Sequence, residues 1–334
     1  MKEYVIGVDI GATKSHLALF DTEGNFIDLG HWGPLNYECL PGLYVQFEDE
    51  FGQFVTGILS KHGIGMNQVL YSVLGVGGVD TKRQHDNISK ILKKLQFERF
   101  TLVNDAFLGI PAGNSSGNGT GICAINGSGC TLAGIDKEGG MLQIGGVGDV
   151  SADKGGGGYI GGRLVSAVYS ELFRKGERTL MTGLLFQKLG ITSKYDYIER
   201  MHEKTEDWSF SINTCSPMVF EAVAQNDNVA AEILMEIAAS YAGGISCMIE
   251  ELRFPAEDEL FIIFAGSVFV KGEHPFLLDS LKKQVSSDNP GRLITYKLLD
   301  VPNVAGAVIL AFKALQGRTS YYDKVCAQLR DLKI

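Results

Sequence analysis

Two carboxylates and two glycine-rich turns are the residues of this chain best suited to chemistry. Asp9 stands two residues before a turn that runs from Gly11 to Lys14, and Asp105 comes two residues after a short apolar run that ends at Val103. Glycine lets backbone N–H groups approach an anion closely, and the hydroxyl of Thr13 adds another donor. One carboxylate beside such a turn could hold a hydrated Mg²⁺, and another could accept a proton. The set is therefore suited to chemistry on a bound polyphosphate.

The second glycine-rich turn, Asn126-Gly-Ser-Gly129, repeats the setting of the first. In both copies one apolar run enters the turn, another leaves it, and an Asp-x-Glu-Gly sequence follows, at 21–24 and at 136–139. This pattern predicts a β-hairpin with a glycine-rich tip. Either tip alone could be an ordinary tight turn, but a repeat with matched turn residues favours shared architecture. We therefore expect two similar domains whose tips hold one polyphosphate from both sides.

The composition of the chain limits its class of function. It has 334 residues, of which 45% are hydrophobic, and this is enough for two domains with their own cores. The net charge of −9 argues against nucleic acid as a partner, because phosphate backbones bind clustered Lys and Arg. No uninterrupted apolar run reaches the roughly 18 residues of a membrane span. The six cysteines include no C-x-x-C pair. We expect a cytoplasmic protein that has no membrane segment, disulfide framework or structural zinc.

The elements that would position these residues alternate between strands and helices. The first half follows the order βββαβαβα, which predicts a mixed sheet with helices packed on it. The Ser/Gly/Asn-rich segment 113–119 is interpreted as a linker, after which the pattern starts again with helical insertions. We expect an N-terminal domain at 1–112, a C-terminal domain at 113–316 and a helical tail at 317–334. The clearest predicted elements are a helix at Leu43–Lys61 and strands at Val69–Val76, Phe100–Val103 and Leu260–Ala265.

Several residues allow more than one interpretation. Asp9 and Asp105 both lie at the carboxyl end of a predicted strand, the edge where ligands bind in open α/β folds. Asp105 could equally be the N-cap of the helix that follows it. The glycine run 155–158 could be a lid or an ordinary loop. A P-loop is excluded, because Thr13 occupies the position where glycine must precede Lys-Ser.

Five motifs, in order along the chain, resemble those of the actin-like superfamily of ATPases and sugar kinases. Asp9-x-Gly-x-Thr and Asn126–Gly129 are similar to its two phosphate motifs, and Ile262–Ser267 resembles its adenosine motif. Val103–Asp105 and Val304–Ala307 resemble its two connecting helices. The resemblance covers about residues 4–316. It implies an α/β fold with two actin-like (ribonuclease H-like) ATPase domains around an interdomain cleft.

Within that superfamily the chain most resembles the N-acetylglucosamine kinase group, which includes the BadF/BadG-type ATPases. Leu35-Asn36 and the segment Gly145–Gly148, followed by Asp153, carry this closer resemblance. The group implies ATP and Mg²⁺ as cofactors, a small sugar as substrate and a homodimer. Asp105 would be the general base for the sugar 6-hydroxyl, and Asp9 would hold Mg²⁺ through water.

The other site residues follow from the same resemblance. Those implied for nucleotide and phosphate are Asp9, Gly11, Ala12, Thr13, Lys14, Gly127, Ser128, Gly129, Gly266 and Ser267. Those implied for the sugar are Asn36, Asn104, Cys130, Thr131, Gly146, Val147, Gly148 and Asp153.

The chain departs from the eukaryotic kinases of this group at two positions near the sugar. Val147 replaces a tryptophan, and Cys130-Thr131 stands where an asparagine contacts the acetamido group. The smaller valine could admit the 3-O-lactyl group of N-acetylmuramic acid, or it could indicate glucose or glucosamine.

Three other functions remain open within the resemblance. One is an ATPase activator of a radical dehydratase, whose iron–sulfur cluster is shared between two subunits through cysteines. Cys123 and Cys130 would instead lie on opposite strands of one hairpin. The others are a sugar-responsive repressor, which would carry a helix-turn-helix before the first phosphate motif, and a non-catalytic nucleotide-binding scaffold.

Overall fold

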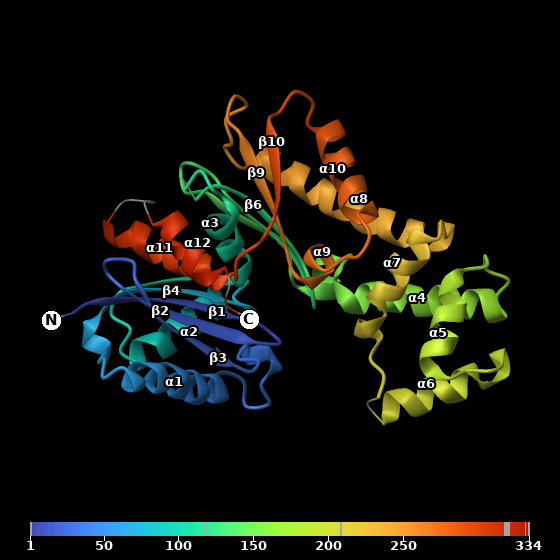
Figure 1. Cartoon of the computed structure of the whole chain (residues 1–334), viewed down its shortest axis with the longest axis horizontal. Helices are drawn as coiled ribbons and strands as arrows, with labels where there is room; N and C mark the ends of the chain where they lie inside the picture. The colour runs from blue at the N-terminus through green and yellow to red at the C-terminus, as the bar shows by residue number, and fades with distance from the viewer. Residues whose placement is uncertain (1, 118, 208, 317–320, 331, 333–334) are drawn as a thin grey trace.

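Two five-stranded mixed sheets form the frame of the molecule (Figure 1). The computed structural model describes the whole chain apart from residues 1, 118, 208, 317–320, 331 and 333–334. The sheets have spatial orders β3-β2-β1-β4-β5 and β8-β7-β6-β9-β10. In each, a hairpin and a third antiparallel strand are followed by two parallel strands. The predicted repeat is therefore a repeat of the complete sheet, and the predicted fold class is confirmed.

The first sheet is buried on both faces. In β1, Ile6 and Val8 pack in a core with α1 and α2, whereas Val5 packs in a core with α11 and α12. Coverage of both faces explains why its central strands are almost continuously apolar. The elements of this half are β1 (Tyr4–Ile10), β2 (Ser15–Asp21), β3 (Phe26–Trp32), α1 (Leu43–Lys61), β4 (Val69–Val76), α2 (Lys82–Lys94), β5 (Phe100–Val103), α3 (Gly109–Gly113), α11 (Val304–Gln316) and α12 (Tyr322–Leu329).

The second sheet carries the helical insertions. α8 and α10 pack on one face, and the opposite face contacts α3 and the 3-10 turn before it. α5 and α6 lie away from both sheets (Figure 1). The elements of this half are β6 (Gly121–Asn126), β7 (Cys130–Ile135), β8 (Met141–Gly145), α4 (Gly156–Phe173), α5 (Leu180–Leu189), α6 (Tyr197–Glu206), α7 (Ser216–Ala224), α8 (Asn228–Glu251), β9 (Leu260–Ala265), α9 (Ser267–Val270), α10 (Phe276–Asp288) and β10 (Ile294–Leu298).

α3 and α11 lie between the two halves and pack against each other. Their approach is so close that a Cβ at Gly306 would overlap the carbonyl oxygen of Leu108. α11 contacts β1, β4 and β2 of the first sheet, although it comes after the whole second sheet in sequence. The boundaries at 112 and 316 stay a prediction, and α11 packs with the first half. Of the predicted tail 317–334, residues 317–320, 331 and 333–334 lie outside the described residues, and α12 forms much of the remainder.

The glycine run 155–158 is neither a lid nor a loop. Gly156 to Gly158 form the first turn of α4. A Cβ at Gly157 would lie 2.8 Å from the carbonyl oxygen of Asn213, and one at Gly161 would overlap that of Ile212. The glycines therefore let α4 pack directly against the backbone of the 3-10 turn at Ile212–Cys215.

Among the described residues, α8 is the one helix long and apolar enough to cross a membrane. It packs against α7 and α10 and buries nine side chains in the core of the second half. Buried core helices of soluble proteins can be equally long and apolar, so the packing of α8 explains its composition.

Candidate functional site

The two glycine-rich tips face each other. Thr13 Oγ1 and Ser128 Oγ are 3.4 Å apart, although the residues are 115 positions apart in the sequence. Each tip closes its hairpin with one backbone hydrogen bond, from Gly11 N–H to the Lys14 carbonyl at 3.1 Å and from Gly127 N–H to the Gly129 carbonyl at 2.9 Å. The residues Ala12, Thr13, Lys14, Ser128 and Gly129 are exposed. Exposed hydroxyls and the backbone of exposed tip residues thus line both sides of one space, as an anion site requires.

The second tip is enclosed by α4 and α9. The N–H of Gly156 donates to Asn126 Oδ1 at 2.7 Å, and the N–H of Gly157 donates to the Gly127 carbonyl at 2.9 Å. A Cβ at Gly127 would lie 3.5 Å from the backbone nitrogen of Ser267. Gly266 and Ser267, predicted to contact adenosine, therefore adjoin the second tip.

A hollow of about 290 Å³ opens beside Ser267. Phe220 and Val268 supply apolar walls, while Thr214 and Lys271 supply polar ones. Mostly apolar walls with a few polar groups are typical of sites for small ligands. This hollow is the place where a nucleoside whose phosphates lie at the two tips could bind.

Asp9 lies at the end of β1, beside the first tip. Its Oδ1 accepts a hydrogen bond from Asn303 Nδ2 at 3.3 Å, and its Oδ2 lies 3.8 Å from Nδ1 of the buried His16. The described residues contain no group of three or more His, Cys, Asp or Glu side chains that could hold a metal ion. Mg²⁺ is usually bound through one or two carboxylates together with water and substrate phosphates. The half-buried carboxylate of Asp9 fits that role.

Asp105 follows β5 and is half-buried. Both Asp105 and Asn36 lie close to Gly77. A Cβ placed on Gly77 would be 3.7 Å from Asp105 Oδ2 and 3.3 Å from Asn36 Nδ2. Burial, together with the charges of Asp9 and Asp80, raises the pKa of Asp105 to about 7. A carboxylate with a pKa near the working pH is well suited to be a general base.

The N-cap interpretation of Asp105 is wrong, because the cap is Asn104. Asn104 Oδ1 accepts a hydrogen bond from the N–H of Ala106 at 2.9 Å and begins the 3-10 turn Asp105–Leu108. The N-cap is the residue just before the first residue of the turn, so the cap is Asn104 when the turn begins at Asp105. The same Asn104 side chain donates from Nδ2 to Asp80 Oδ1 at 3.0 Å.

Asn36 is buried beside the same edge of the sheet. Its backbone N–H donates to the Gly11 carbonyl at 3.3 Å, and its Oδ1 accepts from the Glu38 N–H at 3.0 Å. The structure thus brings Asn36 together with the adjacent Asn104 and Asp105, from two separate segments of the first half.

The loop that follows β8 is organised around Asp153. Asp153 Oδ2 accepts hydrogen bonds from the N–H groups of Gly146 at 3.0 Å and Gly148 at 2.9 Å. Gly145, Gly146 and Gly148 have φ values of 76°, 92° and 60°, a region that favours glycine. Val147 lies between them with a side chain that is 48% exposed.

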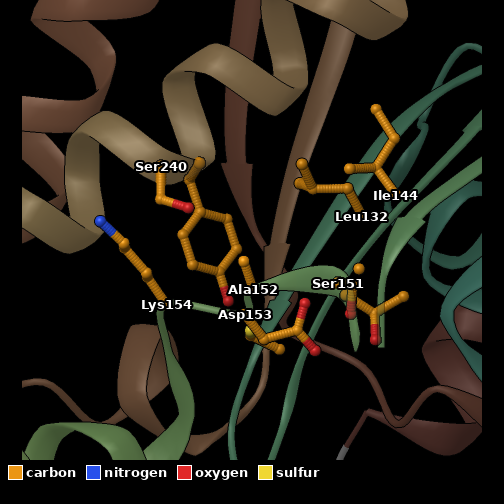
Figure 2. Close-up of a pocket in the computed structure, with 11 residues that line it drawn as sticks. Leu132, Ile144, Ser151, Ala152, Asp153, Lys154 and Ser240 are labelled. Carbon is orange, nitrogen blue, oxygen red and sulfur yellow. The ribbon is translucent and has the colours of Figure 1, made fainter. Parts of the chain in front are cut away.

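A small cavity of about 60 Å³ adjoins this loop (Figure 2). Cys130, Thr131 and Asp153 line it together with residues of α8. Burial raises the pKa of the Cys130 thiol to about 11, so the thiol stays protonated at neutral pH. Lys154 extends away from Asp153 in Figure 2, and its Nζ pairs with Glu236 at 2.9 Å.

Three further polar residues reach this region without having been predicted. Asp80 follows β4 after three intervening residues, and the placement of Asp9 and Asp105 at the carboxyl ends of their strands is a signal that could have found it. Gln143 of β8 donates from Nε2 to Asp80 Oδ1 at 2.6 Å. Asn303 donates both to Asp9 and, at 2.9 Å, to the backbone carbonyl of Asp105. Nothing local in the sequence marks Gln143 or Asn303.

Known proteins similar to this chain include two curated kinases. It is 27% identical over 323 residues to the N-acetyl-D-glucosamine kinase of Dictyostelium discoideum, with 94% of this chain and 99% of that protein covered. It is 24% identical over 312 residues to the N-acetylmuramic acid/N-acetylglucosamine kinase of Clostridium acetobutylicum, with 92% and 98% covered.

Solved structures share the fold. A Chromobacterium violaceum protein described provisionally as an N-acetylglucosamine kinase matches with a TM-score of 0.66 at 18% identity, over 92% of this chain and 99% of that chain. A ROK family glucokinase from Streptomyces griseus, in complex with glucose and AMPPNP, matches with a TM-score of 0.53 at 19% identity, over 92% and 99%. The sequence model of the BadF/BadG/BcrA/BcrD ATPase family matches residues 6–311. Since this match spans nearly the whole chain, the protein belongs to the BadF/BadG/BcrA/BcrD ATPase family.

Proposed function

We propose that this protein is an ATP-dependent kinase that phosphorylates the 6-hydroxyl of an N-acetylated amino sugar. N-acetylglucosamine is the first substrate that we propose, and N-acetylmuramic acid is the second. The observation that carries the proposal is the half-buried Asp105, with a pKa of about 7, at the edge where two glycine-tipped hairpins meet. The names of the two curated relatives support the same sugar class.

In the proposed reaction the sugar oxygen attacks the γ-phosphorus of ATP. The new O–P bond forms at the sugar, the bond to ADP breaks, and the hydroxyl proton passes to the carboxylate of Asp105. Thr13, Ser128 and backbone amides of the exposed tip residues hold the phosphate oxygens. When bound beside Asp9, Mg²⁺ neutralises charge on these oxygens. The protein contributes mainly alignment and electrostatic stabilisation, as phosphoryl transfer generally requires.

The sugar would lie between Asn36 and Asn104 of the first half and Asp153 with the loop 146–148 of the second. Asn104 and Asp153 are already held by hydrogen bonds within the protein, so they are in place before a ligand binds. Such preorganisation reduces the cost of ordering the site. Cys130 and Thr131 would face the substituents of the ring. We also expect a cytoplasmic homodimer, which size-exclusion chromatography with light scattering can test.

The two cysteines of the second hairpin do not suit the activity of a dehydratase activator. A cluster shared between two subunits needs cysteine thiolates at an exposed surface. Cys123 is fully buried and Cys130 partly buried, and burial raises the pKa of both thiols. Absorbance near 400 nm in anaerobically purified protein would favour the activator over the kinase.

A coupled ADP-release assay tests the proposed function. The panel is N-acetylglucosamine, N-acetylmuramic acid, glucosamine, glucose and N-acetylmannosamine, each with Mg²⁺ and ATP. We expect turnover above the sugar-free rate for the first two. Turnover of glucose or glucosamine alone would support the alternative sugar kinase, and a background rate with every sugar would contradict the proposal.

A further inference from the structure

One hydrogen bond joins the two halves of the molecule at the sugar side of the site. Asp80 belongs to the segment between β4 and α2, and Gln143 belongs to β8 of the other sheet. The amide Nε2 of Gln143 donates to Asp80 Oδ1 at 2.6 Å. The neighbouring contact between the two tips, from Thr13 to Ser128, is longer at 3.4 Å.

Each end of this bond is connected to residues that we place around the sugar. On the first half, Asp80 Oδ1 also accepts from Asn104 Nδ2 at 3.0 Å, and Asn104 directly precedes Asp105. On the second half, Gln143 Nε2 lies 3.4 Å from the Gly145 carbonyl, where the loop bound to Asp153 begins. The four residues Asn104, Asp80, Gln143 and Asp153 thus belong to one polar network that spans both halves.

The side chain of Gln143 packs closely against the glycine loop that follows β8. A Cβ at Gly146 would lie 3.2 Å from Gln143 Nε2 and 2.8 Å from Thr131 Oγ1. Burial raises the pKa of Asp80, the Gln143 hydrogen bond lowers it, and the charge of Asp153 raises it further. The charge of Asp153 therefore disfavours the ionised form of Asp80, whereas the amide of Gln143 stabilises that form by donating a hydrogen bond.

We propose that Asp80 and Gln143 are positioning residues whose hydrogen bond across the cleft aligns Asn104 with the Gly145–Gly148 loop, so that both halves contact the same sugar. The proposal rests on the proposed sugar kinase function. Neither residue touches the γ-phosphate in this account. Their loss should therefore weaken the use of the sugar and leave the use of ATP nearly unchanged.

An exchange of the two functional groups tests the bond specifically. Gln143→Glu places a carboxylate against Asp80, and we expect kcat/KM for N-acetylglucosamine to fall at least about tenfold, with the KM for ATP within about twofold of wild type. Asp80→Asn keeps an acceptor oxygen and should cost less than about threefold. The double variant, Asp80→Asn with Gln143→Glu, again places an amide opposite a carboxylate and has the net charge of the wild type. Its kcat/KM for N-acetylglucosamine should recover to within about threefold of the value for Asp80→Asn.

Two exposed residues provide matched controls. Gln187→Glu in α5 and Asp49→Asn in α1 make the same chemical changes far from the bond and should leave kcat/KM within about twofold of wild type. Nucleotide binding and the melting temperature of each variant report whether it has folded. If the Gln143→Glu defect persists in the double variant, or if Gln143→Glu behaves as wild type, the proposal is wrong.

Hydrogen exchange separates this proposal from the proposed function. In unliganded protein, Gln143→Ala should speed amide exchange in the 145–148 loop, relative to wild type and to Gln187→Ala. Wild-type protein that turns over no sugar would contradict the kinase function, whereas unchanged loop exchange would contradict the bridge.

Discussion

The hairpins β1–β2 and β6–β7 have the same form and different surroundings. In the first, Asp9 pairs with His16, and in the second the matching position is Ile125, which pairs with Thr131. Both hairpins end in a turn whose aspartate, Asp21 or Asp136, accepts backbone N–H groups through its side chain. The two hairpins therefore share their backbone form and differ beside the tip, where the first has the carboxylate of Asp9 and the second has Ile125.

The second hairpin is instead held by neighbouring elements. Tyr241 of α8 donates its hydroxyl to the Ile125 carbonyl at 2.6 Å, and Asn126 accepts from the N-terminus of α4. A Cβ at Gly266, where φ is 87°, would overlap the carbonyl oxygen of Asn126. The comparison fits the proposed function, in which the first half would supply the charged groups and accept the proton, and the second would supply the walls around the nucleotide and sugar.

Removing the base from the first half should have the largest effect. We expect Asp105→Asn to lower kcat by about 10²–10⁴-fold, because in the proposed reaction the carboxylate accepts the sugar proton. Nucleotide affinity should stay nearly unchanged, since the phosphates are held at the tips. Steady-state kinetics with an equilibrium ADP-binding assay checks both, with Asp49→Asn as control. A variant that keeps more than about a third of the wild-type turnover would show that Asp105 is not the base.

Valine at the two tips tests whether they work as a pair. Gly11→Val and Gly127→Val would each place methyl groups where phosphate must approach, and we expect the Kd for ATP to rise at least about tenfold in each. Gly183→Val is the control, because a Cβ there meets nothing within 4 Å. Isothermal titration provides the measurement. Loss of affinity at one tip alone would mean that the other tip is only architectural.

The pH dependence should reflect the raised pKa of Asp105. Because the base acts only when ionised, kcat/KM for the sugar should be constant above about pH 8, be halved near pH 7 and fall about tenfold per unit below about pH 6. Pre-steady-state or initial-rate measurements from pH 5 to pH 9 would show it. A rate that stays constant down to about pH 5 would indicate an unperturbed carboxylate and contradict the assignment.

A change at the exposed valine of the second half should have the smallest effect. Val147→Trp would fill space beside the sugar, and we expect it to lower turnover of N-acetylmuramic acid about fivefold more than turnover of N-acetylglucosamine. Val150→Trp, at a position that is 88% exposed, is the matched control. Competition between the two sugars measures the ratio directly. Wild-type protein that phosphorylates N-acetylglucosamine and ignores N-acetylmuramic acid would contradict this prediction.

Local sequence was enough to predict much of this arrangement. The strand Val69–Val76 and the helix Leu43–Lys61 have the predicted bounds, because apolar periodicity and flanking turn residues act within a few positions. The N-cap was assigned one residue too late, at Asp105 instead of Asn104, because both residue types cap helices well. The helical first turn at Gly156–Gly158 was missed, since its reason is contact with the distant Asn213.

The polar network of the site could not be predicted in the same way. Gln143 and Asp80 are 63 positions apart, and Asn303 and Asp9 are 294 apart. Each pair meets only because two sheets and α11 pack together. Side-chain hydrogen bonds over such separations depend on the complete fold and leave no periodic signal in sequence.

In the proposed function, the first half with Asp9 and Asp105 and the second half with the nucleotide hollow act together on one hydroxyl of an amino sugar. Phosphorus and proton NMR of the product formed from N-acetylglucosamine, Mg²⁺ and ATP tests this most directly. The account predicts one sugar phosphate, substituted at the 6-oxygen, that forms in equal amounts with ADP. Phosphate on another hydroxyl, or ADP released together with inorganic phosphate and no sugar phosphate, would contradict it.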